Sequence, residues 1–184
     1  VKDFDGAFER IDSYLDRHEG DKGIGSMLVY RMMILSRQES PDTVEIESLH
    51  KSVRDKEATY GQPVAMEADR VLSSYYQQIG QLEKARGIYQ RIVFTYRDTI
   101  SKREKAGQPV AASMKQTHDN AALQLGTIEM QAKRSNEAIK WFENARYDAK
   151  LIQEARLRLA KLHYDRRDFP RAVSTLTTKN YITT

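Results

Sequence analysis

Cysteine is absent from this chain, and only four prolines and nine glycines occur among its 184 residues. The lack of cysteine excludes disulfides, thiolate catalysis and zinc sites with cysteine ligands, and it is compatible with both the cytoplasm and a bacterial periplasm. The small number of turn-forming residues argues against an all-β chain. No apolar run is long enough to cross a bilayer, because Arg31 interrupts the richest one, from Met27 to Leu35.

The composition is typical of a folded chain with many solvent-exposed helix faces, since 40% of the residues are hydrophobic and 30% are charged. The length is enough for one domain with a continuous core. The net charge of +4 gives a mild preference for acidic partners and is by itself no argument for nucleic acid.

Apolar residues recur at helical spacing almost throughout, and glycine or proline interrupts the pattern at regular places. The sequence therefore predicts an all-α chain of about nine helices. Their predicted ranges are 3–18, 24–38, 41–60, 63–80, 82–105, 109–134, 135–147, 149–167 and 168–177. We expect Pro41 at the first helical position of the third helix, where its missing N–H has no partner, followed by Asp42 at the positive helix end.

One interval is repeated in three segments, in which an alanine follows a leucine by 13 residues. The pairs are Leu72 and Ala85, Leu125 and Ala138, and Leu159 and Ala172. The last two leucines lie 34 residues apart, and the first two lie 53 apart, which is 34 plus 19. The N-terminal segment 3–11 repeats the apolar pattern of residues 168–176.

Small residues stand on both sides of each predicted helix pair. The first helix carries Ser73, Gly126 or Ala160 directly after the leucine, and the second helix carries the alanine. Small side chains let the two helices approach closely, while larger residues fill the space between them. Because one helical hairpin cannot bury its apolar face alone, the sequence predicts that the hairpins stack.

The 34-residue period with these residue types resembles the tetratricopeptide repeat (TPR) family, well over residues 67–176 and partly in the N-terminal helix. The resemblance implies an α-α superhelix, a right-handed solenoid of antiparallel helix pairs that forms one domain over residues 1–184. Its implied parts are a half repeat (1–20), a diverged helix pair (24–60), a repeat (63–100), an insert or lengthened helices (101–118) and two repeats (119–147 and 149–178). The sequence departs from the family where Asp69, Ala122 and Arg156 replace an aromatic residue and where Arg97 and Lys150 replace a proline.

The resemblance also implies a binding surface, because in such arrays the first helix of each pair lines a concave groove that holds a ligand segment. The matching positions are Arg70, Ser74, Gln77, Gln78, Asn120, Gln124, Thr127, Gln131, Glu154, Arg158, Lys161 and Tyr164. One subgroup of the family grips a C-terminal carboxylate, but here only Arg70 and Arg158 keep a positive charge, and Glu154 reverses one. The pattern therefore argues against that clamp, and the alternative is that these residues are simply exposed polar side chains.

No catalytic or metal-binding motif stands out in the sequence. The four histidines, His18, His50, His118 and His163, lie far apart, without the spacing of metal ligands. His163 occupies the position that Tyr76 holds in an earlier repeat, which favours a packing role. The glycine-rich stretch 20–26 suits a turn between helices better than a phosphate cradle, because its lysine precedes most of the glycines. The sequence therefore predicts neither an enzyme active site nor a cofactor or metal site.

Basic residues gather in two places, at Lys102, Arg103 and Lys105, and in the last hairpin. The second group comprises Arg156, Arg158, Lys161, Arg166, Arg167 and Arg171. A solvated face, an acidic-peptide site and a nucleic-acid site are the three interpretations. Three carboxylates in the same hairpin dilute the charge, which argues against nucleic acid.

The leading hypothesis is an interaction scaffold that binds a partner peptide or protein segment in the concave groove, within a larger protein or complex. The alternative is a helical sensor or effector module of a regulator, which binds nucleic acid or a small ligand. The N-terminal helix resembles the second half of a repeat, and no polar capping helix follows Leu176. Uncapped solenoid ends expose apolar surface, so we expect further repeats in the full protein or self-association through an end.

Overall fold

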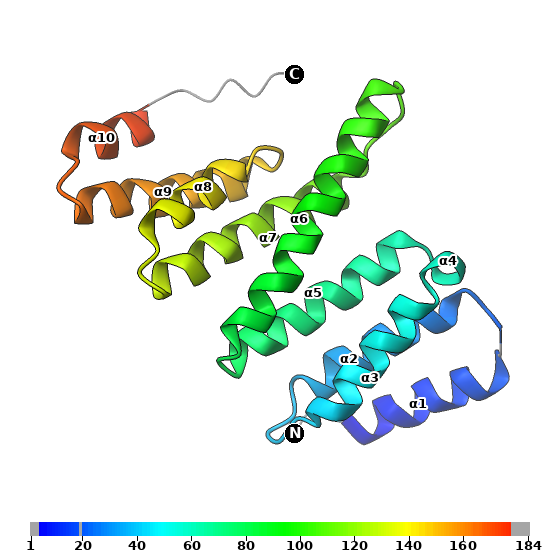
Figure 1. The fold of residues 1–184 in the computed structure, drawn as a ribbon. Coiled ribbons are helices and arrows are strands. Elements are labelled where there is room, and N and C mark those ends of the chain that lie inside the picture. The colour runs from blue at the N-terminus through cyan, green and yellow to red at the C-terminus, as the bar shows by residue number, and fades with distance from the viewer. Residues whose placement is uncertain (1–3, 19, 178–184) are drawn as a thin grey trace. The chain divides into compact units, whose positions relative to one another are not determined.

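The structure, a computed structural model, describes residues 4–18 and 20–177, and within these ranges all regular secondary structure is helical (Figure 1). The helices are α1 (Phe4–Arg17), α2 (Gly23–Leu35), α3 (Thr43–Asp55), α4 (Glu57–Tyr60), α5 (Gln62–Gln78), α6 (Leu82–Lys105), α7 (Ala112–Gln131), α8 (Ser135–Asn144), α9 (Ala149–Asp165) and α10 (Phe169–Thr177). The predicted all-α class is confirmed. The single-turn helix α4 is the addition to the nine predicted helices, and it divides the third of them.

None of the helices in the described part of the chain combines the length and the apolar character that a membrane span requires. The chain divides into two compact units, Val1–Ile88 and Tyr89–Thr184, and the boundary falls inside α6.

The first unit is built around α2, which packs against α1, α3 and α5 (Figure 1). Helix α3 also contacts α5, and α4 contacts α2, α3 and α5. Met32 of α2, Ile46 of α3 and Met66 of α5 are fully buried between these helices. Gly25 permits the close approach of Tyr60, since a Cβ atom built on Gly25 would lie 2.5 Å from the Tyr60 ring.

Pro41 and Pro63 lie near the starts of α3 and α5. Helix α3 begins at Thr43, because the Asp42 side chain caps it by accepting a hydrogen bond from the Glu45 N–H at 3.0 Å. The expectation that Pro41 is the first helical residue is therefore wrong, since Pro41 precedes the capping residue. Pro63, by contrast, lies in the first turn of α5 as predicted.

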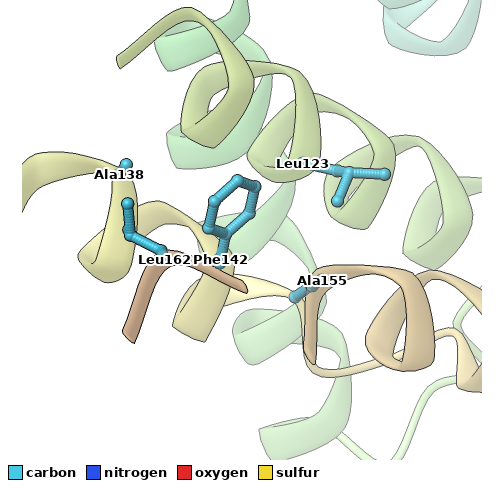
Figure 2. Packing of buried hydrophobic residues seen from close by; sticks show 6 residues of the cluster. Leu123, Ala138, Phe142, Ala155 and Leu162 are labelled. Carbon is cyan, nitrogen blue, oxygen red and sulfur yellow. The ribbon is translucent and has the colours of Figure 1, made fainter. Parts of the chain in front are cut away.

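In the second unit, α7 packs against α8 and α9, α8 contacts α9, and α9 contacts α10. Figure 2 shows the buried cluster that joins the first three of these helices. It consists of Leu123, Ala138, Phe142, Ala145, Ala155 and Leu162. The small residues that the repeat pattern singles out are all buried in both units. They are Ser73, Ala85, Gly126, Ala138, Ala160 and Ala172.

A polar cluster links α3, α5 and the start of α6 in the first unit. The Tyr76 hydroxyl donates a hydrogen bond to the Glu47 carboxylate, and the Lys84 ammonium lies 3.2 Å from the same oxygen. The bond from Tyr76, followed by that from Lys84, lowers the pKa of Glu47. Burial, reinforced by the bond to Glu47, raises the pKa of Tyr76.

Replacing Gly126 with alanine should destabilise the second unit by about 1–3 kcal/mol, because the new Cβ would overlap the buried Phe142 ring. Urea unfolding followed by circular dichroism measures the change. Gly87→Ala is the matched control, since Gly87 also lies inside a helix but has no neighbouring atom within 4 Å of an added Cβ. That variant should gain up to about 1 kcal/mol from helix propensity. Equal effects of the two substitutions would contradict the close approach.

Replacing Glu47 with glutamine should lower stability at pH 7 by less than about 1 kcal/mol, because the side chain is 40% exposed. The folded-state pKa of Glu47 is depressed, so its contribution is complete above the usual value of 4.5 and is lost as the pH falls through the lower folded value. The difference between wild type and variant should therefore shrink in unfolding experiments below about pH 4. Tyr76→Phe, which removes the phenol donor, should reduce the same acid-dependent contribution. A difference that is independent of pH would refute this assignment.

Candidate functional site

Two adjoining cavities open between α2 and α5 in the first unit. The first has a volume of about 220 Å³, and its lining is mainly apolar. It is lined by Ser26, Val29, Tyr30, Met33, Pro63, Val64 and Glu67. The second has a volume of about 80 Å³, and its lining is mainly polar. It is lined by Met33, Ser36, Arg37, Arg70, Val71, Ser74, Tyr75 and Gln78. Because Met33 borders both cavities, we call them together the α2–α5 groove.

Helical spacing explains why these residues share one groove. Positions three, four and seven apart lie on one face of a helix, and the linings of α2 and α5 follow that spacing. The start of α2 faces the start of α5, and the ends of the two helices also face each other, so the helices run parallel. At 1.5 Å per residue, the groove extends over roughly 17–22 Å.

The apolar half of the groove contains a large side chain that is left partly uncovered. Tyr30 is 53% exposed, whereas its neighbour Val29 is only 4% exposed. Met33 is half-buried and lies where the two cavities meet. An aromatic ring beside a methionine offers apolar contact that a bound side chain could cover without rearrangement of the core.

The polar half of the groove carries two arginines. Arg70 donates from Nε to Glu67 at 2.8 Å, so this guanidinium is already paired with a carboxylate of its own helix. The Arg37 side chain is exposed, and within the described part of the chain it makes neither a hydrogen bond nor an ion pair. The ionic side chains that line the groove are Arg37, Arg70 and Glu67, which leaves a net charge of +1.

Of the four groove positions predicted on α5, the structure places Arg70, Ser74 and Gln78 in the lining of the polar cavity. Gln77 lies on the same helix and is half-buried. The α2 half of the groove was not predicted, because residues 24–60 fit the repeat pattern only loosely. The signal that could have found it is the spacing of Ser26, Tyr30 and Met33 along one face of α2, followed by Arg37 in the turn after that helix.

The other eight predicted positions lie in the second unit. Asn120, Gln124, Thr127 and Gln131 are on α7, and Glu154, Arg158, Lys161 and Tyr164 are on α9. The structure brings three of them together, because the Arg158 guanidinium donates to the Thr127 hydroxyl and, at 2.5 Å, to Glu154. A groove that is continuous across both units stays a prediction.

The basic residues of the last hairpin are largely engaged within the second unit. Arg158 pairs with Glu154, Lys161 pairs with Asp165, and Arg171 pairs with Asp168. Arg166 donates to the side-chain oxygen of Asn136 at 3.0 Å. The three ion pairs reduce the positive field that a nucleic-acid backbone would meet.

Two histidines have carboxylate partners that the sequence analysis did not single out. His50 of α3 lies 2.7 Å from Asp69 of α5, and Asp69 is fully buried. His118 lies 2.8 Å from Asp119, and both side chains are buried in α7. His163 is 7% exposed, which agrees with the packing role expected for it.

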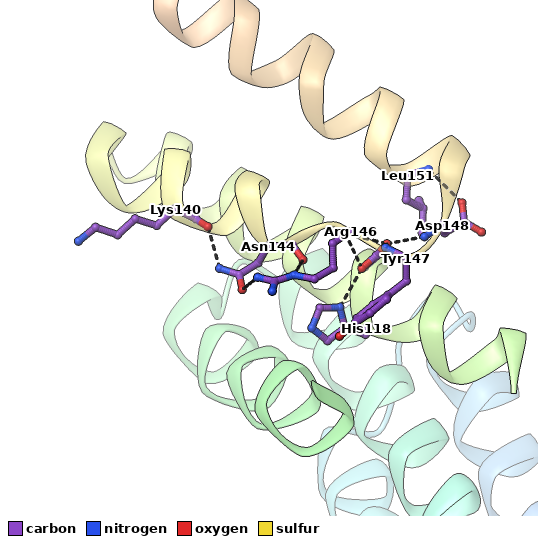
Figure 3. A network of polar contacts seen from close by, with 8 residues as sticks. His118, Lys140, Asn144, Arg146, Tyr147, Asp148 and Leu151 are labelled. Carbon is purple, nitrogen blue, oxygen red and sulfur yellow. Dashed lines mark hydrogen bonds and ion pairs between the residues drawn. The ribbon is translucent and has the colours of Figure 1, made fainter. Parts of the chain in front are cut away.

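Asp119 has a structural role that explains its burial, and Figure 3 labels its partners His118, Arg146, Tyr147 and Asp148. Its carboxylate accepts hydrogen bonds from three consecutive backbone N–H groups, those of Arg146, Tyr147 and Asp148. The shortest measure 2.6 and 2.7 Å. Asp148 then caps α9 by accepting from the N–H groups of Lys150 and Leu151. The buried acid therefore fixes the turn that leads from α8 into α9.

In the part of the chain that the structure describes, no cluster of three or more histidine, aspartate or glutamate side chains could hold a metal ion. The sequence matches no protein-family model and no curated protein.

Replacing Asp119 with asparagine should destabilise the second unit by about 1–3 kcal/mol, because a neutral amide has one acceptor oxygen instead of two charged ones for the backbone donors of residues 146–148 and for His118. Chemical unfolding measures the loss, and hydrogen exchange should become faster at these three amides. Asp165→Asn is the control, since its pair with Lys161 is exposed and contributes less than about 1 kcal/mol. The clamp would be rejected if both variants were equally stable.

Proposed function

We propose that this chain is a protein-interaction module that binds an extended segment of a partner protein in the α2–α5 groove. The observation that carries the proposal is the pairing of an apolar cavity with a polar one along two parallel helices. Binding sites for protein segments combine apolar anchors with a few polar groups that fix the register. The groove has both, in Tyr30 and Met33 at one end and Arg37 and Ser74 at the other.

The dimensions of the groove suit a short extended segment. A length of roughly 17 Å, measured along α2, accommodates about five residues at 3.3 Å each. An extended segment also presents backbone N–H and C=O groups, for which Ser36, Ser74 and Gln78 provide polar partners.

The proposal includes an array of the TPR type, in which α2, α5, α7 and α9 are the first helices of their pairs. It is supported by the 34-residue spacing of the sequence and by the burial of the small residues on both helices of each pair. It is also supported by the contacts within each unit. Helix α5 touches both α2 and α3, and α9 touches both α7 and α8, as stacked hairpins require.

In this proposal the polar residues of α7 and α9 provide a further surface for a partner. Arg158 is held between Thr127 and Glu154, so its guanidinium is oriented before any ligand arrives. Side chains such as Asn120 and Gln131 offer both donors and acceptors. The proposed role is therefore recognition, without a chemical step.

Peptides selected from a displayed library of random 12-residue sequences test the proposal. We expect selected peptides to slow hydrogen exchange in α2 and α5, and Tyr30→Ala to weaken their binding about tenfold by removing the apolar contact of one aromatic ring. Because Tyr30 is half exposed, the variant should keep its unfolding midpoint. Phe94→Ala is the control, since this aromatic ring of α6 is 45% exposed and lies outside the predicted binding positions. Protection confined to helices other than α2 and α5 would reject the groove.

A further inference from the structure

We propose that the segment bound in the α2–α5 groove carries a large apolar side chain and, about three residues away, a carboxylate that pairs with Arg37. This inference rests on the proposed function and adds the chemistry of the partner to it. The apolar side chain fills the cavity between Tyr30 and Val64, and the carboxylate enters the cavity at the far end of the groove.

The apolar cavity determines the first requirement. Its volume of about 220 Å³ leaves room for a large aliphatic or aromatic side chain, and Val29, Met33, Pro63 and Val64 supply apolar walls. Ser26 and Glu67 stand at its border. Covering the uncovered face of Tyr30 with such a side chain removes apolar surface from water on both partners.

The charges of the groove determine the second requirement. Glu67 pairs with Arg70 and offsets one of the two guanidinium groups that line the groove. Arg37, which stands exposed at the end of the polar cavity, supplies the remaining positive charge. One carboxylate on the segment balances that charge, whereas a phosphate, with nearly two negative charges at neutral pH, exceeds it.

The polar cavity also has the size and the donors for a carboxylate. Its volume of about 80 Å³ holds a small polar group rather than a further large side chain. A guanidinium presents a planar pair of N–H donors that matches the two oxygens of a carboxylate. The Ser74 hydroxyl lies in the same lining and can donate to a remaining lone pair, whereas the Ser36 hydroxyl already donates to the Met33 carbonyl at 2.9 Å.

The separation of the two requirements follows from helix geometry. Tyr30 lies on α2, and Arg37 lies in the turn just after that helix ends at Leu35. At the rise of a helix, their separation of seven positions corresponds to roughly 10 Å along the axis. An extended chain rises about 3.3 Å per residue, so the apolar residue and the carboxylate are about three positions apart. This spacing is the sequence signature expected of a bound segment.

Peptides selected as above are made in pairs that differ only by Glu→Gln or Asp→Asn at the acidic position, and their Kd values are measured by fluorescence anisotropy. On the wild-type chain, loss of the carboxylate should weaken binding about tenfold, as for one charge-assisted pair at a partly exposed site. On the Arg37→Gln chain, the two peptides should bind within about twofold of each other. Arg10→Gln is the matched control, because this arginine is exposed on α1 and should leave the tenfold preference intact.

Free and amidated C-termini distinguish the two sources of a carboxylate. If amidation leaves Kd unchanged, the recognised carboxylate belongs to a side chain. If amidation raises Kd and Glu→Gln does not, the recognised carboxylate is the C-terminal one. Both results support recognition of a carboxylate by Arg37, provided that Arg37→Gln removes the preference.

Other outcomes separate this inference from the proposed function. The inference is overturned, and the groove kept, if peptide binding depends on Tyr30 but not on the acidic residue. The same conclusion follows if Arg37→Gln weakens the binding of the acidic and the neutral peptide equally. Peptides that bind Tyr30→Ala as well as wild type and protect neither α2 nor α5 overturn both. Failure to select any peptide from the library also counts against both.

Discussion

The close approach of neighbouring helices through residues with little or no side chain is the constraint on which this structure depends. In the second unit, α7 and α8 come together where Gly126 meets the Phe142 ring and where Ala138 is completely buried. In the first unit, Gly25 accepts the ring of Tyr60 in the same way. Since packed interiors tolerate little change in volume, these contacts fix the distance between helices and thereby the faces that remain for the next hairpin.

Buried carboxylates add hydrogen bonds and ion pairs to this apolar packing. Asp69 stands where the repeat pattern expects an aromatic residue, and it joins α5 to α3 through His50. Glu129 is fully buried and accepts from Arg134 across the turn between α7 and α8. A buried carboxylate is costly unless its oxygens are bonded, so each pair is satisfied only in one arrangement of its elements. The acids therefore specify geometry where methyl groups alone would allow sliding.

The sequence predicted those parts of the fold that local chemistry decides. Helix α6 occupies residues 82–105 as expected, because Gly80 and Gly107, with φ of 77° and 63°, provide the left-handed residues that end one helix and the next. The start of α3 was misplaced because the Asp42 side chain caps the helix and so excludes Pro41 from it. In the groove, the polar positions of α5 were found, but Tyr30 and Met33 of α2 were not. Both belong to a helix that is apolar on several sides, and only tertiary packing decides which apolar residues stay uncovered.

Glu67 explains why the α2–α5 groove has two chemically different halves. It borders the apolar cavity, yet its carboxylate faces Arg70 of the polar one, so the ion pair lies where the halves meet. Without this acid, two guanidinium groups would share one small cavity and repel each other. With it, the positive charge is concentrated at Arg37, far from Tyr30. Apolar contact at one end can then supply affinity, while the charge at the other end fixes the direction of a bound segment. Complementary charges generally contribute specificity and register more than affinity.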